Sequence, residues 1–269
     1  MTKIKKSYKI YSLIIFLFLY LPILILIFFS FNESKSRVSF SGFTFKWYIE
    51  LFHDTQILKA LFNTVLISIT ASILATIIGT LAAVGIRKLK KGLKKAIMTT
   101  SNLPMVNPEI VTGVSLMLLF ISGYKILGFL KLGIITLILS HTVFCIPYVI
   151  LSILPKLNQL NPSLYEAAQD LGCAPVRAFF KVVLPDIMSG VLTGMIMAFT
   201  LSLDDFIISY FTSGTVMTLP IAIYSMTRKI VSPEINALSA LLFLVVLVLL
   251  LIINLRQNVR ENTEVVNLR

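Results

Sequence analysis

Two adjacent carboxylates, in the stretch SLDDFIISYF (202–211), are the side chains of this sequence most suited to chemistry. Asp204 and Asp205 follow seventeen residues, 187–203, that carry no charge. A charged side chain deep in a membrane costs about 2.5–3.5 kcal/mol on insertion scales, and it therefore usually faces protein or a water-filled cavity. Adjacent residues of a helix point about 100° apart, so the two carboxylates cannot both face one partner squarely.

Three interpretations of this acidic pair are open. It could lie at an interfacial turn, where both carboxylates meet water and cap the next segment. It could form a catalytic pair, as in an intramembrane aspartyl protease. That chemistry needs two carboxyls that face each other from separate helices, and the sequence has no G-x-G-D motif. The pair could instead attract cations on a solute path.

Glu109 supports the third interpretation, because at helical rise it lies at a depth comparable to that of Asp204. It follows Pro108, where a helix can break and expose carbonyl groups. Three carboxylates at one level could replace the water around a polyvalent amine, and nearby aromatic rings could add cation–π contacts. The predicted substrate path therefore consists of Asp204, Asp205, Glu109, Phe206 and Tyr210.

The elements that position these residues are predicted to be membrane helices. Of the 269 residues, 57% are hydrophobic and 13% are charged, which is more apolar surface than one soluble core of this length can bury. A helix needs about 20 apolar residues to span a bilayer. Six windows are long enough, at about 10–30, 60–86, 97–121, 132–154, 187–211 and 237–255. The sequence therefore predicts an all-α polytopic membrane protein with six transmembrane helices.

The first window is preceded by four lysines, so a cleaved signal peptide is an alternative interpretation. Its apolar stretch, Tyr11–Ser30, is however longer than the 7–15 residues typical of such peptides, and no small-residue cleavage site follows it. We expect a retained helix. His141, in the fourth window, has no second His and no acidic residue at ligand spacing, so we expect a hydrogen-bonded packing residue and no metal site.

Charge predicts the orientation of the helices. If the N-terminus is inside, sixteen Lys and Arg residues fall in the cytoplasmic segments and eight in the outer ones. This excess follows the positive-inside rule and places both termini in the cytoplasm. The net charge of +12 is thus explained by topology, and we see no nucleic-acid signal in it.

The segment 155–186, between the fourth and fifth windows, is too long for a simple turn. Ser163 and Glu166 have the spacing of a capping box. An apolar stripe at helical spacing follows, and Gly172 stands where a left-handed C-cap is expected. Pro175 can open a second short helix, and Leu184-Pro185 is expected to end it before the next span. The stripe consists of Leu164, Ala167, Ala168 and Leu171.

This pattern predicts a helix, a sharp break and a second helix on the cytoplasmic face. The small side chains of Ala167 and Ala168 would let another protein approach closely. An amphipathic linker that lies on the membrane surface explains the periodicity equally well.

The same segment resembles the EAA signature of permease subunits of bacterial ABC importers. The signature reads EAA, three residues, G, nine residues and I-x-L-P. Here it appears as Glu166-Ala167-Ala168, Gly172 and Val182-x-Leu184-Pro185, with Val182 in place of Ile. The resemblance implies a coupling helix that docks into the ATPase subunit, and it assigns ATPase coupling to Glu166, Ala167, Ala168, Gly172, Leu184 and Pro185.

The chain has no G-x-x-x-x-G-K-[ST] motif to cradle phosphates. We therefore expect no cofactor on this chain, with ATP and Mg²⁺ used by a partner ATPase, and we expect that the chain is not an enzyme by itself.

Four further segments resemble the spermidine/putrescine permease subunits of the PotC type. They are 107–120, 140–150, 197–214 and 219–238, within a similarity that runs from about residue 60 to 255. The resemblance implies a type I importer (MetI-like) fold in the bacterial inner membrane and polyamine as cargo. It also implies a heterodimer with a PotB-like permease, two PotA-like ATPase subunits and an outer PotD-like polyamine-binding protein. Glu109 departs from the Asp expected there.

These observations predict three parts: an N-terminal helix and outer loop at 1–59, a transporter core at 60–255 and a cytoplasmic tail at 256–269. The same machine with another cargo, such as iron, sulfate or an amino-acid derivative, remains an alternative. An anion carrier would need Lys, Arg or bare helix N-termini at depth, and the spans contain no basic residue there. An ion-coupled secondary transporter would need inverted repeats, which we do not detect. A structural subunit without transport activity is a further alternative.

Overall fold

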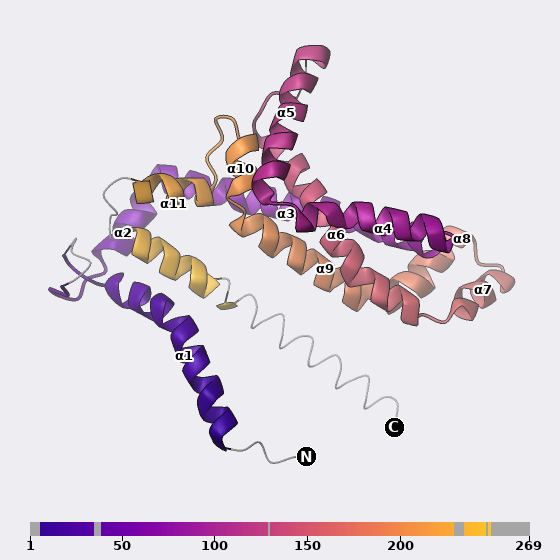
Figure 1. The fold of residues 1–269 in the computed structure, drawn as a ribbon, viewed down its shortest axis with the longest axis horizontal. Coiled ribbons are helices and arrows are strands. Elements are labelled where there is room, and N and C mark those ends of the chain that lie inside the picture. Colours follow the sequence, from indigo (N-terminus) through magenta and orange to yellow (C-terminus); the bar gives the residue numbers. More distant parts are fainter. Residues whose placement is uncertain (1–5, 35–38, 129, 229–233, 246, 249–269) are drawn as a thin grey trace. The chain divides into compact units, whose positions relative to one another are not determined.

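The computed structural model describes residues 6–34, 39–128, 130–228, 234–245 and 247–248 (Figure 1). Within these ranges the regular secondary structure is helical, and one isolated β-bridge joins Asn32 and Phe43. It divides into two compact units, one made of residues 1–58 and 223–269 and the other of residues 59–222.

The first unit contains α1 (Lys6–Phe29) and α2 (Lys46–His53). Its interior is aromatic: the Phe31 ring stacks on Phe43 at 5.0 Å and lies edge-on to Phe45 at 5.5 Å. Trp47 is buried, and its indole Nε1 donates to the Asn32 carbonyl at 2.7 Å. An indole N–H that is buried with a partner satisfies its one polar group, so this cluster fixes the loop after α1.

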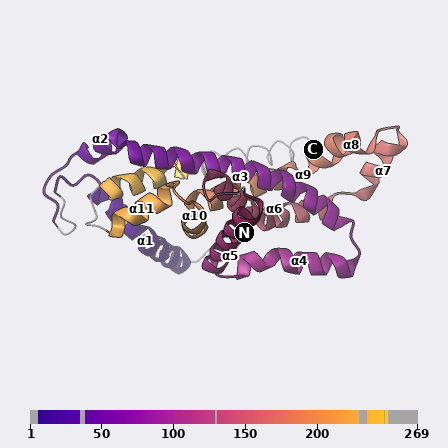
Figure 2. The ribbon, with the colours of Figure 1, turned by 90° about the horizontal axis from the view of Figure 1, so that it is seen from above.

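The second unit carries the residues predicted to form the functional site. Two of its helices, α3 and α11, extend across the boundary into the first unit. Its elements are α3 (Thr55–Arg87), α4 (Lys91–Val106), α5 (Glu109–Leu127), α6 (Ile134–Gln159), α7 (Pro162–Asp170), α8 (Pro175–Ala178), the π-helix η1 (Phe179–Val183), α9 (Leu184–Asp204), α10 (Ile207–Thr212) and α11 (Leu219–Arg228). Figure 2 shows α4 running alongside α6, in agreement with the contacts between them.

Five helices within the described residues are long and apolar enough to cross a membrane. They are Tyr11–Phe29, Thr55–Arg87, Glu109–Ile126, Ile134–Gln159 and Pro175–Asp204. A shorter apolar helix covers Glu234–Val245, and the rest of the predicted sixth window lies largely outside the described residues.

The third predicted window, 97–121, is not one helix. The chain leaves α4 at Asn107, whose ψ of 145° is extended, and α5 begins at Glu109. A proline disfavours the helical conformation of the residue before it, so Pro108 separates the two helices. The apolar span begins only after this break.

The helices α6 and α9 pack against each other through small residues. Gly190, Gly194, Ala198 and Ser202 follow one another at four-residue spacing on α9, and all four are buried. A Cβ atom on Gly194 would lie 3.2 Å from the Val149 Cα on α6. Such small-residue faces let helix backbones approach closely, so the polar end of this face is held directly against α6.

The segment 155–186 forms the predicted helix, break and second helix, but its cap differs from the prediction. Asn161, not Ser163, is the N-cap residue of α7, and its side chain accepts the Ser163 amide at 3.1 Å. Pro162 occupies the first turn, where its missing N–H costs nothing. The predicted capping box of Ser163 and Glu166 is therefore wrong, because the helix begins before Ser163.

The C-terminal end of α7 agrees with the prediction. Gly172 has φ of 82°, the left-handed conformation that favours glycine. Its amide donates to Gln169, and the Cys173 amide donates to Ala168 at 3.1 Å. These two bonds form a Schellman motif, which turns the chain sharply before α8 begins at Pro175.

Leu184-Pro185 does not end a helix, which corrects the prediction. The helix continues from α8 through η1 into α9, and the 30 residues of Pro175–Asp204 form one span. Within η1 the ladder widens, with the Leu184 amide donating to Phe179. A proline inside a helix removes one amide donor and crowds the preceding turn, and the π-turn immediately before Pro185 accommodates it.

Candidate functional site

The two aspartates lie at a break between α9 and α10. Asp204 is the last residue of α9, and Asp205 is extended, with φ of −64° and ψ of 118°. The chain re-enters a helix at Ile207. The expectation that both residues lie on one continuous helix over 187–211 is therefore wrong. The backbone is helical at Asp204 and extended at Asp205.

Asp205 caps the start of α10. Its Oδ2 accepts the Ser209 amide at 2.8 Å, and its Oδ1 accepts the Ile208 amide at 3.4 Å. The residue is buried, with 8% of its surface exposed, whereas Asp204 is exposed. Capping, which was one of the three interpretations of the pair, thus holds for Asp205 alone, and it occurs within protein rather than in water.

His141 on α6 contacts the same carboxylate. Its Nδ1 hydrogen-bonds Ser202 Oγ at 2.7 Å, and its Nε2 hydrogen-bonds Ser209 Oγ at 2.9 Å. The same Nε2 lies 3.5 Å from Asp205 Oδ2. The prediction of a hydrogen-bonded packing residue is confirmed, but the contact with Asp205 was missed.

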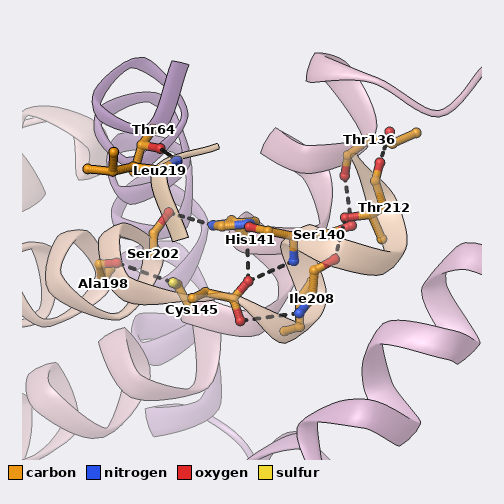
Figure 3. A network of polar contacts seen from close by, with 12 residues as sticks. Thr64, Thr136, Ser140, His141, Cys145, Ala198, Ser202, Ile208, Thr212 and Leu219 are labelled. Atoms are coloured by element: carbon orange, nitrogen blue, oxygen red, sulfur yellow. Dashed lines mark hydrogen bonds and ion pairs between the residues drawn. The ribbon is translucent and has the colours of Figure 1, made fainter. Parts of the chain in front are cut away.

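Local packing explains how these distant residues meet. The small face of α9 lies against α6 and ends at Ser202, one turn after Ala198, whose carbonyl accepts a 3.4 Å contact from Cys145 Sγ. At the other end of α10, the Thr136 hydroxyl donates to the Thr212 carbonyl at 2.9 Å. These contacts hold the break against α6 from both sides (Figure 3).

Glu109 is the first residue of α5 and is exposed. It lies at a helix start, and not inside a longer span as predicted. α5 packs on α10 with Gly113 directly against Phe211, where an added Cβ would meet the ring at 2.9 Å. The same Cβ would lie 3.5 Å from the Ile207 carbonyl oxygen, so the residue one turn after Glu109 contacts the chain two residues after Asp205. The three predicted acids therefore lie near one another.

The two predicted aromatic residues lie on the same stretch as the aspartates. The Phe206 and Tyr210 rings are 5.6 Å apart. Phe206 is half-buried and Tyr210 is 51% exposed. Carboxylates and aromatic ring faces are both groups that attract cations. Among the described residues, no three His, Cys, Asp or Glu side chains are grouped to hold a metal ion.

The residues of the EAA-like pattern lie away from this acidic cluster, at the far end of α6 and α9 (Figure 1). Glu166 and Ala167 are exposed on α7, and Ala168 is partly buried. Of the stripe predicted on this helix, Leu164 and Leu171 are exposed and do not pack against other described residues. Leu184 and Pro185 lie further on, in the first turn of α9.

A groove of about 590 Å³ lies beside α7 and η1. Apolar side chains from α3, α6 and η1 form most of its walls, and Arg87, Lys88 and Glu166 also line it. The Arg87 guanidinium donates to the Leu160 carbonyl at 3.0 Å, and Lys88 Nζ lies 5.6 Å from the Tyr165 ring centroid. These contacts fasten the end of α3 to the segment 155–186.

The sequence pattern of a known family, described as "Binding-protein-dependent transport system inner membrane component", matches residues 75–261. The chain belongs to this family. The match covers more than half of the chain and includes both the acidic cluster and the EAA-like segment. A transport subunit of the inner membrane agrees with the apolar helices described above.

Two relatives of this chain have names that state their cargo. This chain is 39% identical over 214 residues to the putrescine transport system permease protein PotI of Escherichia coli, covering 78% of this chain and 75% of the relative. It is 36% identical over 216 residues to the spermidine/putrescine transport system permease protein PotC of Haemophilus influenzae, covering 80% and 82%.

Solved structures support the fold. A chain of a bacterial ABC transporter that imports the acidic polysaccharide alginate superposes with a TM-score of 0.71. That superposition covers 93% of this chain and 95% of the other, at 21% identity. A chain of an amino acid ABC transporter superposes with a TM-score of 0.54 at 18% identity, covering 78% and 98%. The importer permease fold is thus shared by chains of very different sequence.

Proposed function

We propose that this chain is a permease subunit of an ATP-driven importer of spermidine or putrescine. The observation that carries the proposal is the identity of 36–39% to PotC and PotI proteins over most of both chains. The acidic cluster is consistent with it, because polyamines are cations and carboxylates attract them. The family match supports the coarser role of an import subunit.

In this proposal the chain has six transmembrane helices with both termini in the cytoplasm, as the distribution of Lys and Arg indicates. It pairs with a second, PotB-like permease and receives cargo from an outer PotD-like protein. Two PotA-like ATPase subunits use ATP and Mg²⁺, and this chain binds no nucleotide and catalyses no reaction.

The ATPase would dock on α7 and α8. Support comes from the exposed apolar side chains of Leu164, Leu171 and Val176 on this segment. Exposed apolar patches of this kind commonly mark interfaces with other proteins. The rigid Schellman turn at Gly172 and the continuous helix from Pro175 into α9 would transmit movement of the docked segment to the acidic cluster.

Cargo would pass the exposed carboxylates of Asp204 and Glu109, with Tyr210 beside them and Asp205 behind. A path must bind its ion weakly enough to release it. Two exposed carboxylates, one at the end of α9 and one at the start of α5, meet this requirement better than a closed cage.

The proposal is tested by measuring uptake of labelled spermidine and putrescine in cells that lack their own polyamine importers. The cells express this chain with its cognate subunits, and the control cells lack this chain alone. We expect uptake that requires the chain, that is blocked by unlabelled polyamine, and that excess sulfate, ferric iron or amino acids leave unchanged. Competition by one of these other solutes, with no polyamine uptake, would refute the proposed cargo.

A further inference from the structure

We propose that His141 is a positioning residue for the cation path, and that it acts through the Nε2 side of its imidazole ring on Asp205. This inference rests on the proposed function. It adds that the affinity of the importer for its cargo depends on His141, a buried residue that does not touch the cargo.

The two nitrogens of His141 have different neighbours. Nδ1 faces Ser202 on α9 at 2.7 Å, before the break. Nε2 faces the other side of the break, with Ser209 Oγ at 2.9 Å and Asp205 Oδ2 at 3.5 Å. One ring on α6 therefore connects the end of α9, the linking residue Asp205 and α10. His141 is itself buried, with 2% of its surface exposed.

The chemistry of the partners assigns the ring proton. An ionised carboxylate can only accept hydrogen bonds, whereas a serine hydroxyl can both donate and accept. A proton on Nε2 suits Asp205 and Ser209, and Nδ1 then accepts from the Ser202 hydroxyl. In this tautomer both ring nitrogens and the carboxylate are satisfied within the protein.

The position of Asp205 decides where Asp204 lies. Oδ2 of Asp205 accepts a hydrogen bond from the Ser209 amide and lies 3.5 Å from His141 Nε2. Oδ1 accepts a hydrogen bond from the Ile208 amide. These contacts fix the extended backbone of Asp205, and its neighbour Asp204 is exposed at the end of α9. Loss of the Nε2 contact leaves a buried carboxylate with one partner fewer, which favours a different arrangement of the break.

The rival explanation is that His141 only fills space between α6 and α9. Two substitutions separate these roles, because each keeps one side of the ring. A Gln side chain places its amide near the position of Nε2, so His141→Gln retains a donor toward Asp205 and Ser209. An Asn side chain is shorter and places its amide near Nδ1, so His141→Asn retains only the contact with Ser202.

The experiment measures uptake of labelled spermidine over a range of concentrations by the full importer carrying wild type, His141→Gln, His141→Asn or Ser202→Ala. Membrane levels of each variant are quantified in the same cells. We expect His141→Asn to raise the KM for spermidine about tenfold at a similar maximal rate per copy, while His141→Gln and Ser202→Ala stay near wild type.

Equal effects of Gln and Asn, or a fall in maximal rate with an unchanged KM, would overturn the positioning role. Wild-type protein that imports no polyamine would refute the proposed function and this inference with it. Wild-type import with no difference among the variants would refute the inference alone. If His141→Asn does not reach the membrane, His141→Ser, which retains neither ring contact, is measured in its place, with the same KM increase expected relative to His141→Gln.

Discussion

Gly190 on α9 lies directly against the backbone of Ser152 on α6, since a Cβ atom added to Gly190 would come within 3.0 Å of the Ser152 carbonyl oxygen. This contact is part of the small face that ends at Ser202. The close approach of the two helices therefore determines whether His141 can reach the break between α9 and α10.

Substitution of Gly190 by Leu should separate α6 from α9. Overpacking of this kind costs about 1–3 kcal/mol, so the Tm of the purified complex in detergent should fall by several degrees. The matched control is Gly85→Leu, because an added Cβ at Gly85 on α3 meets nothing within 4 Å. Equal losses of Tm for the two variants would contradict the packing described here.

Asn161→Ala should loosen α7, whereas Ser163→Ala should leave it intact. Loss of an N-cap residue costs about 1 kcal/mol, which corresponds to a roughly fivefold larger equilibrium fraction of open helix. Hydrogen exchange of the first α7 amides in the full complex measures this difference. If Ser163→Ala has the larger effect, the cap is assigned to the wrong residue.

Leu171→Ser should weaken docking of the ATPase without unfolding this chain. Leu171 is 89% exposed at the end of α7, so it contributes little to the interior of this chain and is available to a partner. We expect less ATPase subunit to copurify with the variant, at unchanged Tm of the permease subunit. Leu93→Ser, on the exposed surface of α4, is the control, and equal losses of ATPase in both would argue against docking at α7.

Local sequence patterns predicted much of the fold. Long apolar runs located the spans of α3, α6 and α9, and Gly172 predicted the left-handed turn that the structure contains. The N-cap was placed wrongly although a signal was present, because Pro162 favours the first helical turn and so indicates Asn161 as the cap. The π-turn before Pro185 has no comparable signal in the sequence.

The acidic cluster was predicted only in part, because its geometry depends on contacts between distant helices. The sequence suggested that Glu109 and Asp204 lie at similar depth, and the packing of α5 on α10 places the start of α5 near the break after Asp204. Nothing in the spacing of His141 and Asp205 indicates that they touch. Their contact follows from the approach of α9 to α6, which is a property of the folded unit.

The most direct test of the proposed cation path is spermidine uptake by the importer carrying Asp204→Asn together with Glu109→Gln. The matched control is Asp186→Asn, which neutralises an exposed acid at the opposite end of α9. Removal of both exposed carboxylates should lower uptake at least about tenfold, equivalent to about 1.4 kcal/mol, at equal membrane levels. The control should transport normally. Normal uptake by the double variant would contradict the cation path and leave the acids with a structural role only.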